Sequence, residues 1–489
     1  MSERGQYIAI LDIGTTGTRS IIYDLEARTI GTSYTEYPTK SDIPQQSEQN
    51  PQDWWRTSGE TMKEALRRAR INSKDIVGLG VCTQRAAISP LDKNGEVLYP
   101  ALTWMDARES DSYKAIRQKV AQKNVRISLQ KIYWIKDNYP HIFEKAHKLV
   151  STDSYIYFKL TGNYGSDYSN STYGILDPET MKWSDDMAEE FGIPVDMWPD
   201  LYQAGTVIGE VIEEAADYTG LAAGTPVVVG GGDQQCACLG VGAINEGVAK
   251  ATTGTGTFVD ANLEKPIYDP LNILFTLPHV LKGRWVLEGV LPGTGAILKW
   301  FRDEFCHQEK TLAQNMGIDP YAIIEDQAET VKPGAAGLFV IPLFNFAKGE
   351  IVNLSFAHTR RHIARAIMEG TSYGMRGMTD LMAGMGVNIN ELRIDGGGAR
   401  SPLWRQIQAD IVGKKVVVPQ LADSTSVGAA ILTSSGTGCY SGIDAAVDSM
   451  IKILEERMPQ PENQKIYNAY QPKFMERLLG GFAKVMAGE

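Results

Sequence analysis

Two turns rich in glycine and threonine have the composition of phosphate-binding loops. The first, residues 12–18, follows the apolar segment 7–11, and the second, residues 253–257, lies near the middle of the chain. Glycine lets the backbone approach a ligand closely, while backbone N–H groups and threonine hydroxyls donate to phosphate oxygens. A hairpin turn uses the same residues, so each turn alone is a weak signal. The pair predicts one nucleotide held between two halves.

Carboxylates stand where such chemistry needs them. Asp12, at the end of the first apolar segment, could hold a divalent cation directly or through water. Asp233 follows the apolar run 226–229 and three glycines, and it could accept a proton from an attacking hydroxyl. The alternative for Asp233 is a cap on the helix that follows it. A third glycine-rich strand end, residues 395–399, points to the same cleft.

The elements that must position these residues follow a repeated order. The first turn is flanked by strands at 7–11 and 20–23, and a third strand at 28–34 pairs back on the second. A helix over 52–70 and a strand over 76–82 come next, which predicts an α/β layer arrangement. From residue 248 the strand, turn and strand pattern begins again. We therefore expect duplicated halves, with domains at 1–245 and 246–489.

Both common nucleotide motifs are absent from the chain. No GxGxxG follows the first strand, and no Walker A lysine motif occurs anywhere. The phosphates must therefore be held by a different kind of loop.

Composition limits the class of protein. At 489 residues, with 43% hydrophobic and 22% charged residues, the chain predicts two large globular domains. A net charge of −11 argues against nucleic acid as a partner. Five cysteines, few and odd in number, and the lack of an apolar signal segment or membrane-spanning run predict a cytoplasmic protein with no membrane partner. Cys236 and Cys238 lack the further ligands of a zinc site, so we expect them in the core.

Assembled in order, these segments resemble the FGGY family of carbohydrate kinases. The resemblance spans nearly the whole chain and includes two signature segments, residues 131–138 and 349–369, although Asn353 stands where the family usually has glycine. It implies a duplicated actin-like ATPase (ribonuclease-H-like) α/β fold with an interdomain cleft. It also implies ATP and Mg²⁺ as cofactors, and γ-phosphoryl transfer to a hydroxyl of a small sugar or polyol.

The resemblance assigns roles to individual residues. Asp233 matches the catalytic aspartate, and Asp12 and Asp233 are the expected metal-associated acids. Gly254, Thr255 and Gly256 match a second phosphate loop, while Gly397, Gly398 and Ser401 lie where the family contacts adenosine. The first phosphate loop and the arginine after it are matched by Gly14, Thr15, Thr16 and Arg19. For Arg19 the alternative is a surface ion pair.

The acceptor side combines features of two groups of family members. Predicted substrate contacts are Gln84, Arg85, Trp104, Asp106, Asp233, Gln234 and Phe258. Glycerol kinases share Gln84-Arg85 but have a glutamate where this chain has Ala86, and loss of that hydrogen-bond acceptor argues against glycerol. The W-x-D-x-R segment from Trp104 resembles pentulose kinases, the alternative being a core tryptophan beside a surface ion pair.

We therefore expect a kinase of a primary hydroxyl on a ketopentose, either xylulose or ribulose. Glycerol or another small polyol is the second choice. Two further alternatives are an actin-like ATPase coupled to partner binding and a degenerate member that binds sugar without catalysis. A homodimer is the default expectation for assembly.

Overall fold

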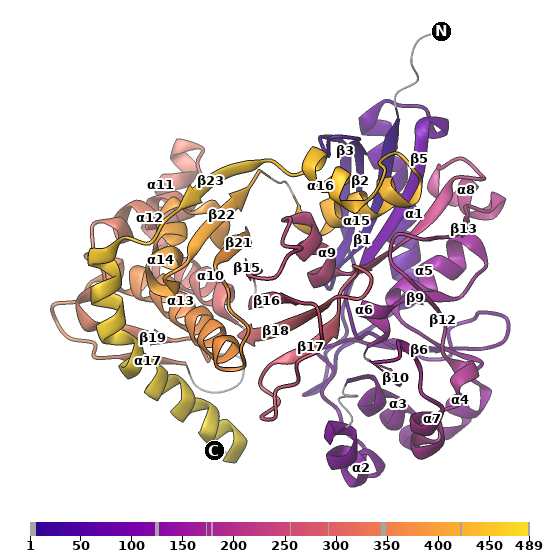
Figure 1. Ribbon diagram of the computed structural model, residues 1–489, viewed down its shortest axis with the longest axis horizontal. Helices are drawn as coiled ribbons and strands as arrows, with labels where there is room; N and C mark the ends of the chain where they lie inside the picture. Colours follow the sequence, from indigo (N-terminus) through magenta and orange to yellow (C-terminus); the bar gives the residue numbers. More distant parts are fainter. Residues whose placement is uncertain are drawn as a thin grey trace. The chain divides into compact units, whose positions relative to one another are not determined.

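Figure 1 shows the computed structural model, which describes residues 6–122, 127–172, 174–177, 179–254, 256–291, 293–343, 349–420 and 423–487. The chain divides into two compact units. Unit 1 is Met1–Gly242, Leu277–Trp285 and Leu421–Ile451, and unit 2 is Ala243–Thr276, Val286–Gln420 and Lys452–Glu489.

The first sheet has six strands in the order β13-β14-β5-β1-β2-β3. β1 pairs with β2 in antiparallel and with β5 in parallel orientation, and β14 lies parallel to β5. Apolar side chains of β1 are fully buried, because both faces of this sheet are covered. Its strands are β1 (Tyr7–Ile13), β2 (Gly17–Asp24), β3 (Thr29–Glu36), β5 (Ile76–Thr83), β13 (Val207–Glu210) and β14 (Pro226–Gly232).

The second sheet repeats this arrangement, in the order β17-β18-β16-β15-β21-β22-β23. β15 is antiparallel to β16 and parallel to β21, as β1 is to β2 and β5. The repeat predicted from the two turns is therefore present in the strand order. These strands are β15 (Val248–Thr253), β16 (Thr257–Leu263), β17 (Phe275–Pro278), β18 (Trp285–Leu291), β21 (Glu391–Gly396), β22 (Lys415–Pro419) and β23 (Ile453–Arg457).

Each unit also has helices and short strands outside its large sheet. In unit 1 they are α1 (Pro51–Ala69), α2 (Asp111–Gln122), α3 (Ile127–Asn138), α4 (Pro140–Lys145), α5 (Thr152–Thr161), α6 (Tyr168–Ser171), α7 (Asp185–Phe191), α8 (Glu213–Thr219), α9 (Asp233–Gly240), α15 (Ser424–Gly436) and α16 (Ile443–Met450), with β4 (Glu48–Gln49), β6 (Ser89–Leu91), β7 (Ala101–Leu102), β8 (Lys148–Val150), β9 (Gly165–Asp167), β10 (Leu176–Asp177), β11 (Lys182–Trp183) and β12 (Asp200–Tyr202). In unit 2 they are α10 (Thr294–Phe305), α11 (His307–Met316), α12 (Pro320–Glu329), α13 (Arg360–Gly384), α14 (Pro402–Val412) and α17 (Pro461–Ala487), with β19 (Phe339–Ile341) and β20 (Glu350–Val352).

The first long helix shows how local sequence sets an element. Asn50 caps α1 by accepting a hydrogen bond from the N–H of Gln52, and Pro51 occupies the first helical position. Trp54 and Met62 are fully buried on one side of the helix. This side covers β2 and β3.

Units and predicted domains differ in the C-terminal part of the chain. The first segment of unit 1 ends at Gly242, three residues before the predicted domain end at 245. The later segment Leu421–Ile451, which was predicted in the second domain, belongs to unit 1. The reason is close packing of α15 on α9: a Cβ on Gly240 would stand 1.8 Å from the carbonyl oxygen of Ser424, and one on Gly428 would stand 1.9 Å from that of Cys236. Because both helices carry small residues at the contact, the later segment returns to the first unit.

Among the described residues, no helix combines the length and apolar character needed to cross a bilayer.

Candidate active site

The first glycine-threonine turn connects β1 to β2 at the carboxyl end of β1. The N–H of Gly14 donates to the carbonyl oxygen of Gly17 at 3.0 Å, and the N–H of Tyr37 donates to that of Thr16. The hydroxyl of Tyr37 donates to the carbonyl oxygen of Gly14. Gly17 is required here, since a Cβ would stand 2.5 Å from the carbonyl oxygen of Thr35. Contacts with β3 and with Tyr37, the residue after it, therefore fix the conformation of the turn.

Three carboxylates and one guanidinium of unit 1 act on one another electrostatically. Asp12, at the end of β1, faces Arg19 in the strand register. Burial raises the pKa of the Asp12 carboxyl well above its ordinary value, and the carboxylates of Asp423 and Asp233 raise it further, whereas Arg19 lowers it. Arg19 forms an ion pair with Asp423. The ion pair considered as the alternative for Arg19 is therefore present, in addition to its place beside the predicted phosphate loop.

The donor set around Asp12 suits Mg²⁺ bound mainly by phosphate and water. Burial and, after it, the like charges of Asp423 and Asp233 raise the pKa of Asp12, and a bound cation would favour the ionised carboxylate against both effects. Within the part of the chain that the structure describes, no three Asp, Glu, His or Cys side chains gather closely enough to hold a metal ion. Mg²⁺ commonly takes only one or two protein carboxylates together with substrate phosphates.

Asp233 begins α9, directly after β14. Its carboxylate is 31% exposed and lies 3.3 Å from the Nε of Arg85, and it accepts a hydrogen bond from the N–H of Gln234 at 2.8 Å. The N-cap residue of α9 is Gly232 and this helix end has no side-chain cap, so Asp233 does not cap the helix. Close approach of β14 to β5 places the aspartate, because a Cβ on Gly230 would stand 2.0 Å from the carbonyl oxygen of Val81. The structure therefore brings Arg85 and Asp233 together at the carboxyl ends of two adjacent parallel strands.

Trp104 stands beside the first phosphate loop. Its side chain is 47% exposed, and its Nε1 donates to the Oγ1 of Thr15 at 2.9 Å. The core alternative for this tryptophan is therefore excluded. A half-exposed indole with its N–H engaged leaves the ring face available for the carbon skeleton of a ligand.

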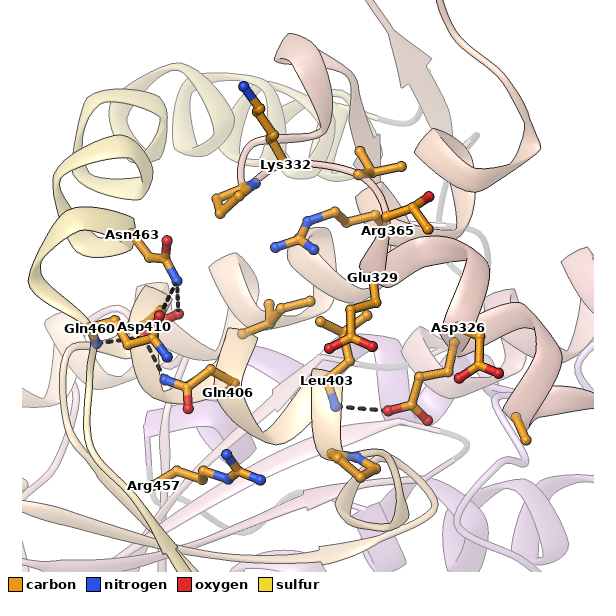
Figure 2. A pocket seen from close by; sticks show the side chains of 17 residues that line it. Asp326, Glu329, Lys332, Arg365, Leu403, Gln406, Asp410, Arg457, Gln460 and Asn463 are labelled. Atoms are coloured by element: carbon orange, nitrogen blue, oxygen red, sulfur yellow. Dashed lines mark hydrogen bonds between the residues drawn. The ribbon is translucent and has the colours of Figure 1, made fainter.

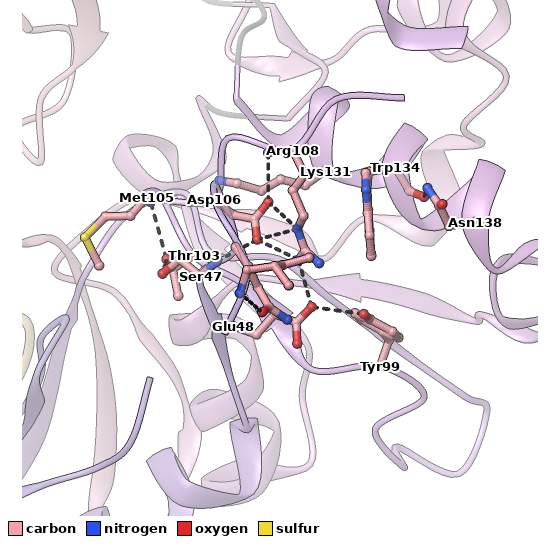
Figure 3. Close-up of polar contacts among 12 residues, drawn as sticks. Ser47, Glu48, Tyr99, Thr103, Met105, Asp106, Arg108, Lys131, Trp134 and Asn138 are labelled. Atoms are coloured by element: carbon pink, nitrogen blue, oxygen red, sulfur yellow. Dashed lines mark hydrogen bonds and ion pairs between the residues drawn. The ribbon is translucent and has the colours of Figure 1, made fainter. Parts of the chain in front are cut away.

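Asp106 is 3% exposed, and its contacts differ from those predicted (Figure 3). Its carboxylate accepts hydrogen bonds from the Nη2 of Arg108 at 2.6 Å and from the N–H of Ser47 at 2.9 Å. Arg108 in turn donates to Glu48 and lies 3.8 Å over the ring of Trp134. The direct acceptor role predicted for Asp106 stays untested, but these contacts favour a role in fixing the loop that carries Trp104.

Ala86 adopts a conformation that is unusual for alanine. Its φ is +61°, in the left-handed region, and its side chain is 4% exposed. The Nζ of Lys131, itself fully buried, donates to the carbonyl oxygen of Ala86. Burial lowers the pKa of Lys131 to about 7, and the nearby Asp106 opposes this shift. Lys131 therefore supports the backbone where the glycerol-kinase glutamate is missing.

The second phosphate turn lies in unit 2 and contacts the start of a helix. The N–H of Gly254 donates to the carbonyl oxygen of Gly256 at 2.9 Å, while Thr255 lies outside the described residues. A Cβ on Gly295, in the first turn of α10, would stand 1.6 Å from the carbonyl oxygen of Gly254. Thr257 and Thr294 share a hydrogen bond of 2.8 Å. This contact places the amino end of α10, whose N–H groups favour anions, beside the turn.

The predicted adenosine segment is next to this turn. Thr253 and Gly396 are partners in the parallel pairing of β15 with β21, so the turns after both strands are adjacent. Cβ atoms on Gly396 and Gly398 would stand 2.6 Å and 2.8 Å from atoms of Thr253. The hydroxyl of Ser401 caps α14 by accepting from the N–H of Trp404. Gly397 lies between the two close contacts.

Gln234 and Phe258 are the remaining predicted acceptor contacts. Gln234 is partly buried in the first turn of α9, and Phe258 is partly buried on β16, in unit 2. Their predicted acceptor contacts stay predictions.

Unit 2 also has a cavity of about 630 Å³ that is separate from these residues (Figure 2). It runs along one face of α14, where Leu403, Gln406 and Asp410 line it. On the same helix Gln408 donates to Thr253 instead, at 3.1 Å. No predicted site residue lines this cavity. We do not assign it to the nucleotide.

Two family models match most of the chain. The model of the N-terminal domain of the FGGY family of carbohydrate kinases matches residues 7–240, and that of the C-terminal domain matches residues 249–436. The chain belongs to the FGGY family of carbohydrate kinases. The predicted family and fold are thereby confirmed, and the protein is an ATP-dependent FGGY carbohydrate kinase.

Relatives and solved structures differ in the acceptors that their names give. Autoinducer-2 kinase of Salmonella paratyphi B is 31% identical over 97% of this chain and 94% of its own, and that of Photorhabdus laumondii is 32% identical over 95% and 92%. Xylulose kinase of Rhodospirillum rubrum superposes with a TM-score of 0.86 at 26% identity, covering 98% of this chain and 100% of its own. Glycerol kinase of Plasmodium falciparum with ADP shares the fold, with a TM-score of 0.81. It is 24% identical, and the superposition covers 98% of this chain and 99% of that chain.

One departure of this FGGY kinase from the family signature has a backbone explanation. Asn353, where the family usually has glycine, has a φ of +66°. Asparagine tolerates the left-handed region better than most residues. Its Nδ2 also donates to the carbonyl oxygen of Gly337 at 3.0 Å.

Sequence reasoning missed three residues of this FGGY kinase. Asp423 caps α15 and forms an ion pair with Arg19. Gln49 donates a hydrogen bond to the carbonyl oxygen of Thr15 in the first phosphate loop. Gly295 has no side chain, which lets the second phosphate turn lie against the start of α10. The cap of α15 has a local signal, Asp423 followed by Ser426 three residues later, but nothing local connects it with Arg19.

Proposed function

We propose that this FGGY kinase transfers the γ-phosphoryl group of ATP to a primary hydroxyl of a small hydroxylated ketone. Autoinducer-2 is the first candidate acceptor, and a ketopentose such as xylulose or ribulose is the second. The observation that carries the proposal is the pairing of Arg85 with Asp233 at 3.3 Å, together with the electrostatic effect of Asp233 on the partly buried Asp12.

Asp233 would act as the general base. Its carboxylate is partly exposed at the start of α9, so it can reach a bound hydroxyl and accept its proton. Arg85, whose side chain is only 10% exposed, would orient that carboxylate and a substrate oxygen through its guanidinium. The face of Trp104 would hold the carbon skeleton, and Gln84 would add a polar contact.

Each unit has a glycine turn that would contact phosphate oxygens of ATP. In unit 1 the backbone of Gly14, Thr15 and Thr16, with Arg19, would contact phosphate oxygens, and in unit 2 Gly254, Gly256 and the amino end of α10 would do so. Gly397, Gly398 and Ser401 would contact adenosine. Bound Mg²⁺, held by Asp12 and assisted by Asp233, would neutralise phosphate charge.

Two observations support a ketone over glycerol. Ala86 provides no carboxylate to accept hydrogen bonds from glycerol hydroxyls, and its backbone carbonyl oxygen already accepts a hydrogen bond from the Nζ of Lys131. Relatives named autoinducer-2 kinases match at 31% identity over 97% of this chain. The 26% identity to a xylulose kinase over nearly the whole of both chains keeps the ketopentose as the second candidate.

Localisation and assembly are also proposed. None of the five cysteines, all of them described, forms a disulfide, and four are buried, which fits the cytoplasm. A two-fold homodimer remains the default proposal.

The test is ADP release coupled to NADH oxidation, with ATP and Mg²⁺ against autoinducer-2, xylulose, ribulose, glycerol and erythritol. We expect the highest kcat/KM with autoinducer-2 or a ketopentose. A preference for glycerol would overturn the reading of Ala86, and ADP release independent of any acceptor would favour an ATPase.

A further inference from the structure

Gln49 is a buried amide that none of the predicted site roles uses. It is the second residue of β4, and it is 2% exposed. Its Nε2 donates to the carbonyl oxygen of Thr15 at 2.7 Å and to the Oγ1 of Thr39 at 2.8 Å. Its Oε1 accepts from the Nε2 of Gln84 at 2.8 Å and from the Nε1 of Trp54 at 3.1 Å. Both donors and both lone pairs are therefore in use.

The orientation of this amide follows from its partners. The indole N–H of Trp54 can only donate, so it must meet the oxygen of the Gln49 amide, and the carbonyl of Thr15 must meet the nitrogen. Rotation of the amide by half a turn would therefore break contacts on both sides. Gln49 has one arrangement that satisfies all of its neighbours.

These contacts join the acceptor side to the phosphate side of unit 1. Gln84, a predicted acceptor contact, also donates its N–H to the carbonyl oxygen of Ile13 at 2.7 Å, just before the phosphate turn. Trp104, the predicted wall of the acceptor pocket, donates to the hydroxyl of Thr15. Thr15 is thus held through its backbone by Gln49 and through its side chain by Trp104.

We propose that Gln49 is a positioning residue that couples acceptor binding at Gln84 to the arrangement of the first phosphate loop at Thr15. The inference rests on the proposed function, which gives Gln84 and Thr15 their roles. A shift of Gln84 on acceptor binding must carry the Gln49 amide with it, because an unsatisfied buried amide is costly. The amide then repositions the Thr15 carbonyl and its neighbouring N–H groups.

The other residue of β4 serves a separate network, which allows a clean test. Side chains alternate along a strand, and Glu48 binds Arg108 at 2.7 Å and accepts from the hydroxyl of Tyr99. Replacement of Gln49 by methionine keeps the volume and leaves the Glu48 contacts intact. Thr39→Val is the matched control. It removes a hydrogen-bond partner of Gln49 that belongs neither to the predicted acceptor contacts nor to the first phosphate loop.

The experiment measures the dissociation constant of a non-hydrolysable ATP analogue with and without the best acceptor, for the whole protein. In the wild type we expect the acceptor to tighten binding of the analogue by about fivefold or more, a typical coupling. In Gln49→Met we expect this ratio to fall to within about twofold of one, and acceptor-independent ATP hydrolysis to rise relative to transfer. Thr39→Val should retain the wild-type ratio.

Trp104→Phe gives a second measurement if Gln49→Met folds poorly. Phenylalanine keeps an aromatic face but removes the N–H that binds Thr15, so we expect the ratio to fall while the dissociation constant of the acceptor changes less. An unchanged ratio in Gln49→Met, or an equal loss in Thr39→Val, would overturn the inference alone. Absence of acceptor-dependent turnover in the wild type would overturn the proposed function and the inference with it.

Discussion

Arg19 forms an ion pair with Asp423, although 404 residues separate them in the chain. Asp423 also caps α15 by accepting a hydrogen bond from the N–H of Ser426 at 3.0 Å. One carboxylate therefore anchors the returning C-terminal segment and contributes to the charge around Asp12. Unit 1 thus includes the late segment Leu421–Ile451 as well as the first part of the chain.

Two substitutions separate these contributions. Asp423→Ala removes both the helix cap and the ion pair, so we expect unfolding free energy to fall by about 1 kcal/mol. Asp423→Asn keeps a good cap and loses only an ion pair with a 39% exposed arginine, so it should lose less than about 0.5 kcal/mol. Urea unfolding followed by tryptophan fluorescence measures both, and equal losses would contradict the capping role.

The conformation of Ala86 predicts an unusual effect of glycine. At φ +61° an alanine is strained by about 1 kcal/mol or more, and Ala86→Gly releases that strain. At Ala87, which is equally buried but has negative φ, the same change should cost about 1 kcal/mol. We expect Ala86→Gly to melt at or above the wild-type temperature and Ala87→Gly below it. The reverse order would contradict the left-handed backbone at Ala86.

Lys131 predicts a pH dependence of stability. Its pKa is lowered to about 7 in the folded protein from 10.5, so between these values the unfolded state binds more protons. The stability that Lys131 contributes therefore rises with pH across this window, by up to about 1.4 kcal/mol per pH unit, and is lost as pH falls towards 7. Urea unfolding of wild type and Lys131→Met at pH 7, 8 and 9 measures it. Parallel pH profiles would contradict burial of the amine.

Gly295 predicts a selective loss of nucleotide binding. A Cβ there would stand 1.6 Å from the carbonyl oxygen of Gly254, so Gly295→Ala must displace the second phosphate turn. We expect KM for ATP to rise by about tenfold or more, with less change in KM for the acceptor. Gly384→Ala is the control, since no atom lies within 4 Å of its added Cβ. Initial-rate kinetics compare the two, and equal KM values for ATP would contradict the role of this contact.

Local sequence was sufficient for the parts of the site that lie within a single strand and its turn. Asp12, Gly14, Asp233 and Gly254 each lie at or just after the end of a largely buried strand, and the repeat of the strand and turn pattern predicted the duplicated strand order. The family and fold predicted from these motifs are confirmed by the matched domain models. The roles of individual residues stay predictions.

Contacts between distant segments left no local signal. Return of α15 to unit 1 depends on Gly240 meeting Gly428 across two helices, and neither glycine is unusual in its own segment. Gln49 was not predicted because a single buried glutamine has no pattern until its four partners are assembled. Asp106 shows the opposite case, in which a motif was clear but its side chain faces Arg108 and the Ser47 backbone.

Asp233→Asn removes the carboxylate that we propose as the base for phosphoryl transfer to the acceptor. Asp186→Asn, the same change at an exposed position in α7, is the control. In the coupled ADP-release assay with the best acceptor, we predict that Asp233→Asn lowers kcat by about 10²-fold or more while Asp186→Asn retains wild-type rates. Acceptor-dependent ADP release at a wild-type rate in Asp233→Asn would contradict the role of Asp233 as the base.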